Sequence, residues 1–102
     1  MKRAVITGLG IVSSIGNNKA EVLESLKTGK SGISASEQFK EYNLRSQVCG
    51  DIDLDVTAII NRKTMRFMGE ASAYAYIAMQ EAIDDAGLTD EQVSNPRTGL
   101  LA

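Results

Sequence analysis

The sequence feature that most restricts the possible folds of this chain is a set of alanines at helical spacing. Four alanines recur every three or four positions: Ala71, Ala75, Ala78 and Ala82. Residues with this spacing lie on one face of a helix, and small side chains there let another backbone come close. We therefore predict a long helix over residues 69–86, buried against a sheet or a second helix and ended by Gly87. Asp84 and Asp85 would fall in its last turn, where the helix dipole disfavours anions.

A short apolar run followed by glycines opens the chain. Residues 3–7 show no alternation of apolar and polar side chains, which predicts a strand buried on both faces. Gly8 and Gly10 follow it and predict a loop with unusual backbone angles or a close approach. This order resembles a dinucleotide-binding fingerprint, but Ser13 stands where that pattern needs a third glycine. A tight connection from strand to helix is favoured, and nucleotide binding is the disfavoured alternative.

Shorter elements fill the first half of the chain. Asn17 or Asn18 can cap a helix over residues 19–28 that ends at Gly29. Its expected apolar stripe consists of Val22, Leu23 and Leu26. Residues 29–55 are mixed in character, with short extended pieces expected at 48–49 and 52–54.

The second half is mostly helical. Residues 57–68 predict short helical turns ahead of the long helix. Residues 89–92 match a capping box and predict a short final helix. Residues 98–102 resemble a strand that has only begun, so we expect a piece of a longer protein. The order strand, helices, strand is that of an α/β protein.

Composition restricts the possible functions. The 102 residues suffice for one small domain, and their 43% hydrophobic content is typical of a soluble globular protein. The net charge of −2 gives no reason to expect nucleic acid or an anionic membrane as a partner. No apolar run approaches the roughly 18 residues needed to span a bilayer. We therefore expect a cytoplasmic protein.

The chain has no histidine and a single cysteine, Cys49. Histidine is the commonest general base and metal ligand, so the chain lacks the commonest acid–base catalyst and we expect no metal site. A reactive cysteine needs a cation, a helix N-terminus or a histidine beside it, whereas Cys49 is followed two residues later by Asp51. That carboxylate would raise the pKa of the thiol, so a structural or incidental cysteine is the favoured interpretation.

One segment carries cations without acids. Residues 56–68 hold Arg62, Lys63 and Arg66 and no Asp or Glu. On a helix, Arg62 and Arg66 lie one turn apart, and Lys63 adjoins them. Such a patch suits a phosphate or an acidic helix of a partner protein, although three cations in a short stretch are often only a solvated face. Arg45 is a further candidate that the sequence alone does not place.

Several stretches in fixed order resemble the condensing enzymes, the β-ketoacyl-acyl carrier protein synthases. The first is the Gly-x-Gly-x-Val-Ser-x-x-Gly-Asn pattern that ends at Asn17. The others are residues 26–33, residues 62–68, the end of the alanine-rich helix at residues 85–88, and residues 97–102. Together they cover nearly the whole chain. The opening and residues 62–68 are more similar to the synthase I branch of the family than to the synthase II branch.

The resemblance implies a fold and a reaction. The fold is a layered, thiolase-like α/β arrangement in a homodimer. Residues 1–102 would form the N-terminal part of the first half, with its first strand, covering helices and the start of a second core strand. The reaction is a decarboxylative condensation of an acyl group with malonyl-acyl carrier protein in fatty acid synthesis, without a cofactor. The family uses one cysteine and two histidines that lie beyond residue 102, and Cys49 does not match that cysteine's motif.

The resemblance also implies a partner. Basic residues at the positions of Arg62, Lys63 and Arg66 are implicated in docking the acidic acyl carrier protein, with Arg45 as a plausible neighbour. Three hypotheses follow. The chain is part of an acyltransferase, a non-catalytic module that binds the carrier protein, or a nucleotide-binding enzyme with an atypical glycine loop.

Overall fold

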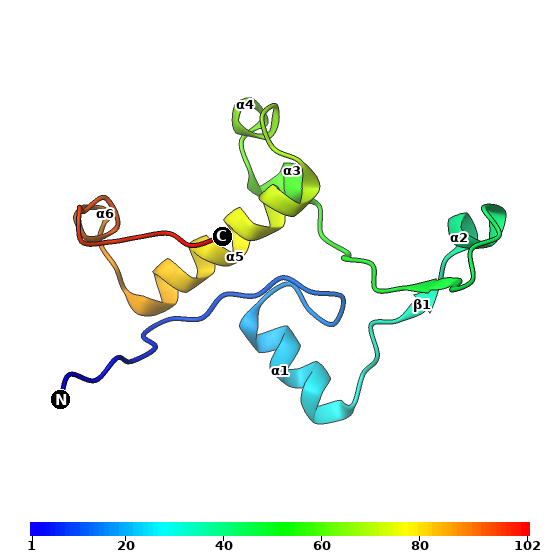
Figure 1. Ribbon diagram of the computed structural model, residues 1–102, viewed down its shortest axis with the longest axis horizontal. Coiled ribbons are helices and arrows are strands. Elements are labelled where there is room, and N and C mark those ends of the chain that lie inside the picture. The colour runs from blue at the N-terminus through cyan, green and yellow to red at the C-terminus, as the bar shows by residue number, and fades with distance from the viewer.

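The computed structural model describes all 102 residues, from Met1 to Ala102 (Figure 1). Helices predominate, and the two strands are short. In chain order the elements are α1 (Lys19–Thr28), β1 (Ser34–Ala35), α2 (Glu37–Glu41), β2 (Val48–Cys49), α3 (Val56–Ile59), α4 (Arg62–Met65), α5 (Glu70–Ala86) and α6 (Asp90–Val93).

The two longest helices have the ends that the sequence predicts. Helix α1 begins after Asn18, whose side-chain oxygen accepts a hydrogen bond from the amide of Glu21 at 2.9 Å. It ends at Gly29, and α5 ends at Gly87; their φ angles of 69° and 64° lie in the left-handed region that favours glycine. Both predicted helices are thus confirmed, and the capping box that begins α6 at Thr89 is confirmed as well.

The predicted apolar stripe of α1 is wrong at two of its three positions. Val22 is buried, whereas Leu23 and Leu26 are exposed to 51% and 67%. The other buried residue of α1 is Ser25, whose hydroxyl donates to the carbonyl oxygen of Ile15 at 2.5 Å. Helix α1 therefore packs on the polar loop that precedes it rather than on an apolar layer.

The only sheet is a pair of two-residue strands. β1 and β2 are antiparallel, with Ser34 opposite Cys49 and Ala35 opposite Val48. β2 confirms the extended piece predicted at residues 48–49, while residues 52–54 form no strand. Helix α2 connects the two strands, and the three elements together form an arm that projects from the rest of the chain (Figure 1).

The strands predicted at residues 3–7 and 98–102 are absent from this structure. An isolated extended segment satisfies no ladder of backbone hydrogen bonds, so it becomes a strand only beside a partner strand. Here residues 1–12 form no regular element; the part around Gly8 and Gly10 lies against α5, and the chain before it runs out past the end of that helix (Figure 1). The apolar side chains of Val5 and Ile6, predicted to be buried, are 78% and 91% exposed.

The C-terminal part of the alanine face of α5, at Ala78 and Ala82, receives the segment around Gly8 and Gly10. A Cβ atom on Gly10 would overlap the carbonyl oxygen of Ala78, and one on Gly8 would overlap that of Ala82. The prediction that small residues let another backbone approach is therefore confirmed at Ala78 and Ala82, whereas Ala71 and Ala75, predicted to be buried with them, are exposed. The partner, however, is the glycine segment and not the sheet or helix that we expected.

The core is small and the chain is open. The buried residues are Val22, Ser25, Ile60 and Ala73, and of these Ala73 alone has no exposed surface. The radius of gyration is 17.0 Å, against about 13 Å for a compact domain of 100 residues. None of the helices combines the length and apolar composition that crossing a bilayer requires.

Candidate functional site

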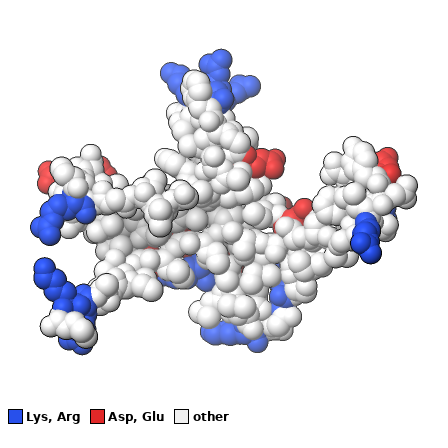
Figure 2. Space-filling view, in the orientation of Figure 1, with Lys and Arg blue, Asp and Glu red and all other residues white.

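Three exposed cations gather on and beside helix α4. Arg62 and Lys63 lie in the helix, Arg66 caps its C-terminus, and the three line one concavity together with Asn61. We refer to Arg62, Lys63 and Arg66 as the α4 basic patch. Figure 2 shows it as a group of blue side chains at the tip of the projection that carries α4, with no red carboxylate among them. The structure thus brings together the three cations that the sequence singles out.

The local sequence explains why these cations are exposed. Ile60 is buried with 4% exposure and fixes the chain at the end of α3. Asn61 then starts a new helix, because its side-chain oxygen accepts from the amide of Lys63 at 2.9 Å. The ion pairs of the structure join Lys19 to Asp85 and Lys40 to Glu37, so no carboxylate neutralises the α4 basic patch.

Arg45 does not belong to this patch. It is exposed in the segment between α2 and β2 and does not line the concavity beside α4. Figure 1 shows that segment on the projecting arm, apart from α4. The structure therefore leaves Arg45 separate from Arg62, Lys63 and Arg66.

Cys49 has the environment of an unreactive thiol. It is half-buried in β2, and burial is the main cause that raises its pKa above the ordinary value. A hydrogen bond to Asp51 and the negative charge of Asp51 raise the pKa further, against a smaller lowering by a hydrogen bond to Ser36. The predicted effect of Asp51 is confirmed. A thiol that resists ionisation is a poor nucleophile at neutral pH.

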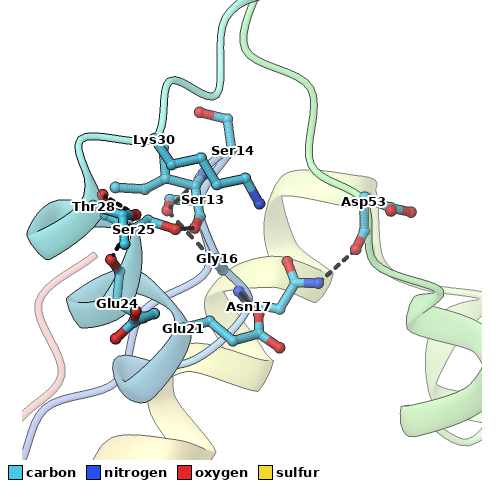
Figure 3. Close-up of a pocket in the computed structure, with 11 residues that line it drawn as sticks. Ser13, Ser14, Gly16, Asn17, Glu21, Glu24, Ser25, Thr28, Lys30 and Asp53 are labelled. Carbon is cyan, nitrogen blue, oxygen red and sulfur yellow. Dashed lines mark hydrogen bonds between the residues drawn. The ribbon is translucent and has the colours of Figure 1, made fainter.

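A polar pocket lies between the loop before α1 and one side of that helix, from its first turn to its last (Figure 3). Its lining residues are Ser13, Ser14, Ile15, Gly16, Asn17, Glu21, Glu24, Ser25, Thr28, Lys30 and Asp53. The side-chain amide of Asn17 donates to the carbonyl oxygen of Asp53 at 2.5 Å and so connects the loop to the segment before α3. The backbone amide of Asn17 donates to the carboxylate of Glu21 at 2.7 Å. These contacts tie segments together and provide no acid–base pair for catalysis.

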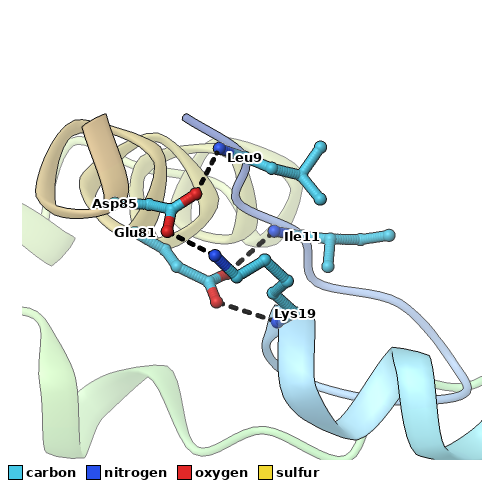
Figure 4. A network of polar contacts seen from close by, with 5 residues as sticks. All are labelled: Leu9, Ile11, Lys19, Glu81 and Asp85. Atoms are coloured by element: carbon cyan, nitrogen blue, oxygen red, sulfur yellow. Dashed lines mark hydrogen bonds and ion pairs between the residues drawn. The ribbon is translucent and has the colours of Figure 1, made fainter. Parts of the chain in front are cut away.

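A second polar network joins α5 to the start of the chain (Figure 4). The two carboxylate oxygens of Glu81 accept from the backbone amides of Ile11 at 2.9 Å and Lys19 at 2.8 Å. Asp85 accepts from the amide of Leu9 at 3.0 Å and forms an ion pair with the ammonium group of Lys19. The bond from Lys19 and then the bond from Leu9 hold the pKa of Asp85 below its ordinary value.

Sequence reasoning missed this network. Glu81 and Asp85 are four residues apart and therefore lie one turn apart on the same face of α5. Ala78 and Ala82 are also four apart on the neighbouring face, where the glycine segment packs. The sequence did contain a signal for this network, namely a pair of acids beside a stripe of small residues. A backbone that packs closely on the small residues needs acceptors for its amides, and the acids can supply them.

These residues belong to a known enzyme family. All of residues 1–102 match the model of the β-ketoacyl synthase N-terminal domain, so the chain belongs to the β-ketoacyl synthase family, as its motifs predict. A relative is the 3-oxoacyl-[acyl-carrier-protein] synthase 1 of Haemophilus influenzae, 63% identical over 101 residues that cover 99% of this chain and 25% of that protein. The synthase 1 of Escherichia coli (strain K12) is 58% identical over 103 residues, covering 100% of this chain and 25% of that protein.

The comparison also separates the two branches of the family. The 3-oxoacyl-[acyl-carrier-protein] synthase 2 of Coxiella burnetii is 30% identical over 100 residues, covering 97% of this chain and 24% of that protein. The predicted similarity to the synthase I branch is therefore confirmed. The chain spans about a quarter of the length of the curated relatives that it matches.

Proposed function

We propose that this chain acts as the N-terminal portion of a 3-oxoacyl-[acyl-carrier-protein] synthase of fatty acid synthesis. The reaction is the decarboxylative condensation of an acyl group with malonyl-acyl carrier protein, and it uses no cofactor. Within that enzyme, residues 1–102 contribute a docking site for the carrier protein. The observation that carries this proposal is the α4 basic patch, whose exposed cations line one concavity and form no ion pair with a carboxylate.

Electrostatics support docking at this place. The chain as a whole carries a net charge of −2, so it does not attract an acidic protein by its overall charge. A local group of unpaired cations does, because complementary patches steer the encounter and set the orientation of two proteins. Arg45, on the separate arm, is proposed as an outlying contact with the same partner.

The catalytic groups belong to the remainder of the enzyme in this proposal. The chain contains no histidine, and its one thiol has a raised pKa. Condensation needs a nucleophile that ionises readily and a partner that moves protons. We therefore propose that the cysteine and the two histidines of the family lie outside residues 1–102.

The wider architecture follows from the family. We propose that residues 1–102 are the N-terminal part of the first half of a thiolase-like, layered α/β fold in a cytoplasmic homodimer. Residues 3–7 and 98–102 are extended here and carry exposed apolar side chains such as Ile6 and Leu101. Neighbouring strands of the complete sheet would supply the hydrogen bonds that turn these segments into strands.

A charge-reversal experiment tests the docking site. The variant carries Arg62→Glu and Arg66→Glu, and its affinity for acyl carrier protein is measured by calorimetry at low and at physiological salt. Exposed charges act most strongly at low salt. We expect Kd to rise at least about tenfold there, which corresponds to about 1.4 kcal/mol, and the difference to shrink as salt is added.

The matched control carries Lys2→Glu and Lys27→Glu, which change the net charge equally but lie outside the α4 basic patch. Its affinity is expected to stay close to that of the unchanged protein, and Arg45→Glu measures the outlying contact separately. Equal affinities for the patch variant and the unchanged protein at low salt would refute the docking site. Ketoacyl product formed by the 102-residue chain alone would refute the proposal that catalysis lies elsewhere, whereas binding by a gene product that ends at Ala102 would favour a non-catalytic module.

A further inference from the structure

Two carboxylates of α5 accept hydrogen bonds from three backbone amides that lie far from the helix in the sequence. Leu9, Ile11 and Lys19 donate to Asp85 and Glu81 across 62 to 76 positions of the chain. The ammonium group of Lys19 adds a charge pair to Asp85. These contacts, which we call the carboxylate clasp, hold residues 8–19 along one side of α5 (Figure 4).

We propose that Glu81 and Asp85 act as a clasp that holds residues 8–19 on α5 through their carboxylate groups, and that acid opens the clasp by removing the charge of Asp85 opposite Lys19. The inference concerns a conformational device of this chain and does not depend on the proposed function. It follows from the geometry of the acceptors and from the position of Lys19 at the start of α1.

Glu81 needs both of its oxygens as acceptors. One oxygen accepts from Ile11 in the glycine segment, and the other accepts from Lys19, the first residue of α1. The amides in the first turn of a helix have no partner within that helix, so Glu81 supplies a cap to α1 from a distant element. A protonated carboxyl carries a hydroxyl hydrogen on one oxygen and loses acceptor capacity at the place where two donors meet.

Asp85 adds the charge. It lies in the last turn of α5, where the helix dipole disfavours an anion. The ammonium group of Lys19 and the amide of Leu9 offset that effect and hold the pKa of Asp85 below its ordinary value. The acid is therefore stabilised by the contacts that the clasp makes, and opening the clasp returns Asp85 to an unfavourable position.

No neighbouring charged group can replace the contacts that Glu81 and Asp85 make. Besides Glu81 and Asp85, the titratable groups that line this place are Lys19 from α1 and Tyr76 and Asp84 from α5. Residues 8–12 contribute no charged side chain, and neither does α3. Lys19 is thus the one cation facing two acids of the clasp and Asp84. Loss of either carboxylate charge removes an anchor of residues 8–19 that no neighbour restores.

The sign of the pH dependence follows from the lowered pKa of Asp85. Its contribution is present above the ordinary aspartate value of 3.8 and is lost as the pH falls through the lowered pKa. The amide signals of Leu9, Ile11 and Lys19 are followed by nuclear magnetic resonance in the unchanged 102-residue chain from pH 7 to pH 2. We expect them to shift and lose protection together in the acid range, before the amides in the middle of α5 do so.

Two isosteric variants test the same device at pH 7. Glu81→Gln leaves one acceptor oxygen for two donors, and Asp85→Asn removes the charge opposite Lys19. We expect hydrogen exchange of the three amides to accelerate at least about tenfold in each variant, as local opening does. The control is Asp84→Asn, because Asp84 only accepts from the side chain of Gln80 at 2.9 Å, and there the three amides should keep their protection.

The outcomes separate the clasp from general unfolding. Faster exchange of the three amides with unchanged exchange in the middle of α5, around Ile77, supports the clasp. The proposal is overturned if the three amides show no acid titration in the unchanged chain. It is also overturned if Asp84→Asn accelerates their exchange as strongly as Glu81→Gln and Asp85→Asn.

Discussion

Gly10 is half-buried and has no room for a side chain. A Cβ atom there would overlap the carbonyl oxygen of Ala78 and lie 2.8 Å from the amide nitrogen of Ala82. Both are backbone atoms of α5, which do not move aside as the end of a flexible side chain does. The close approach of the two backbones therefore depends on the absence of a side chain at residue 10.

We predict that Gly10→Ala destabilises the chain by about 1–3 kcal/mol, the usual cost of forcing an extra group into a packed contact. The midpoint of urea unfolding, followed by circular dichroism, measures the change. Gly99→Ala is the control, because nothing lies within 4 Å of a Cβ atom built there. Equal midpoints for both variants would contradict the close contact with α5.

Cys49 provides a second test at the level of single residues. Burial raises the pKa of its thiol most, and the hydrogen bond and charge of Asp51 raise it further. Asp51→Asn removes the charge, so we predict a lower pKa and faster alkylation by iodoacetamide near neutral pH. The rate is measured as a function of pH, with Asp53→Asn as the control for a charge removed two residues further on. A rate profile that does not move in Asp51→Asn would show that the carboxylate is not a cause.

At the level of elements, α1 depends on the residue that precedes it. The side-chain oxygen of Asn18 accepts from the amide of Glu21 at 2.9 Å, one of the amides that the helix itself leaves without a partner. Asparagine and aspartate are comparably good at this position, whereas alanine is poor.

We therefore predict that Asn18→Ala lowers the free energy of unfolding by about 1 kcal/mol, while Asn18→Asp leaves it nearly unchanged. Urea unfolding at pH 7 measures both variants. Similar losses in the two variants would mean that Asn18 contributes through something other than its capping oxygen.

Local signals predict the ends of these elements well. Asn18, Gly29, Gly87 and Thr89 each act within one or two turns of helix, so the sequence shows their effect directly. The positions of α3, α4 and β2 were predictable for the same reason. The grouping of Arg62, Lys63 and Arg66 also follows from the short helix that carries two of them.

Features that depend on distant segments were not predictable in the same way. Residues 3–7 have the composition of a strand but lack a partner strand here. Leu23 and Leu26 have the spacing of a buried stripe, yet α1 packs on the loop around Ile15. The clasp formed by Glu81 joins segments 62 and 70 positions away, and no local pattern states which backbone will arrive there.

At the level of the whole molecule, the chain has much more surface than its mass requires. Its accessible area is 8636 Å², against about 5,600 Å² for a compact monomer of 11.0 kDa. Large apolar side chains contribute to the excess, including Ile6 at 91%, Phe67 at 91% and Leu101 at 99% exposure. Exposed apolar surface on this scale is characteristic of surfaces that associate with other protein.

We predict that the 102-residue chain on its own binds an apolar dye and forms larger species as its concentration rises. Sedimentation velocity over a hundredfold range of concentration measures the association. The double variant Ile6→Lys and Leu101→Lys places charges on the two extended segments and should reduce it. A chain that stays monomeric and binds no dye would show that it closes its apolar surface in solution.

The contact between the glycine segment and α5 limits which pairs of substitutions can compensate each other. In ordinary core packing, a larger side chain on one side is rescued by a smaller one opposite. At residue 10 the obstacle is the carbonyl group of Ala78 and not its methyl group, so Ala78→Gly would not restore Gly10→Ala. Residue 10 should therefore tolerate little variation in a library of paired variants, whichever residue stands at position 78.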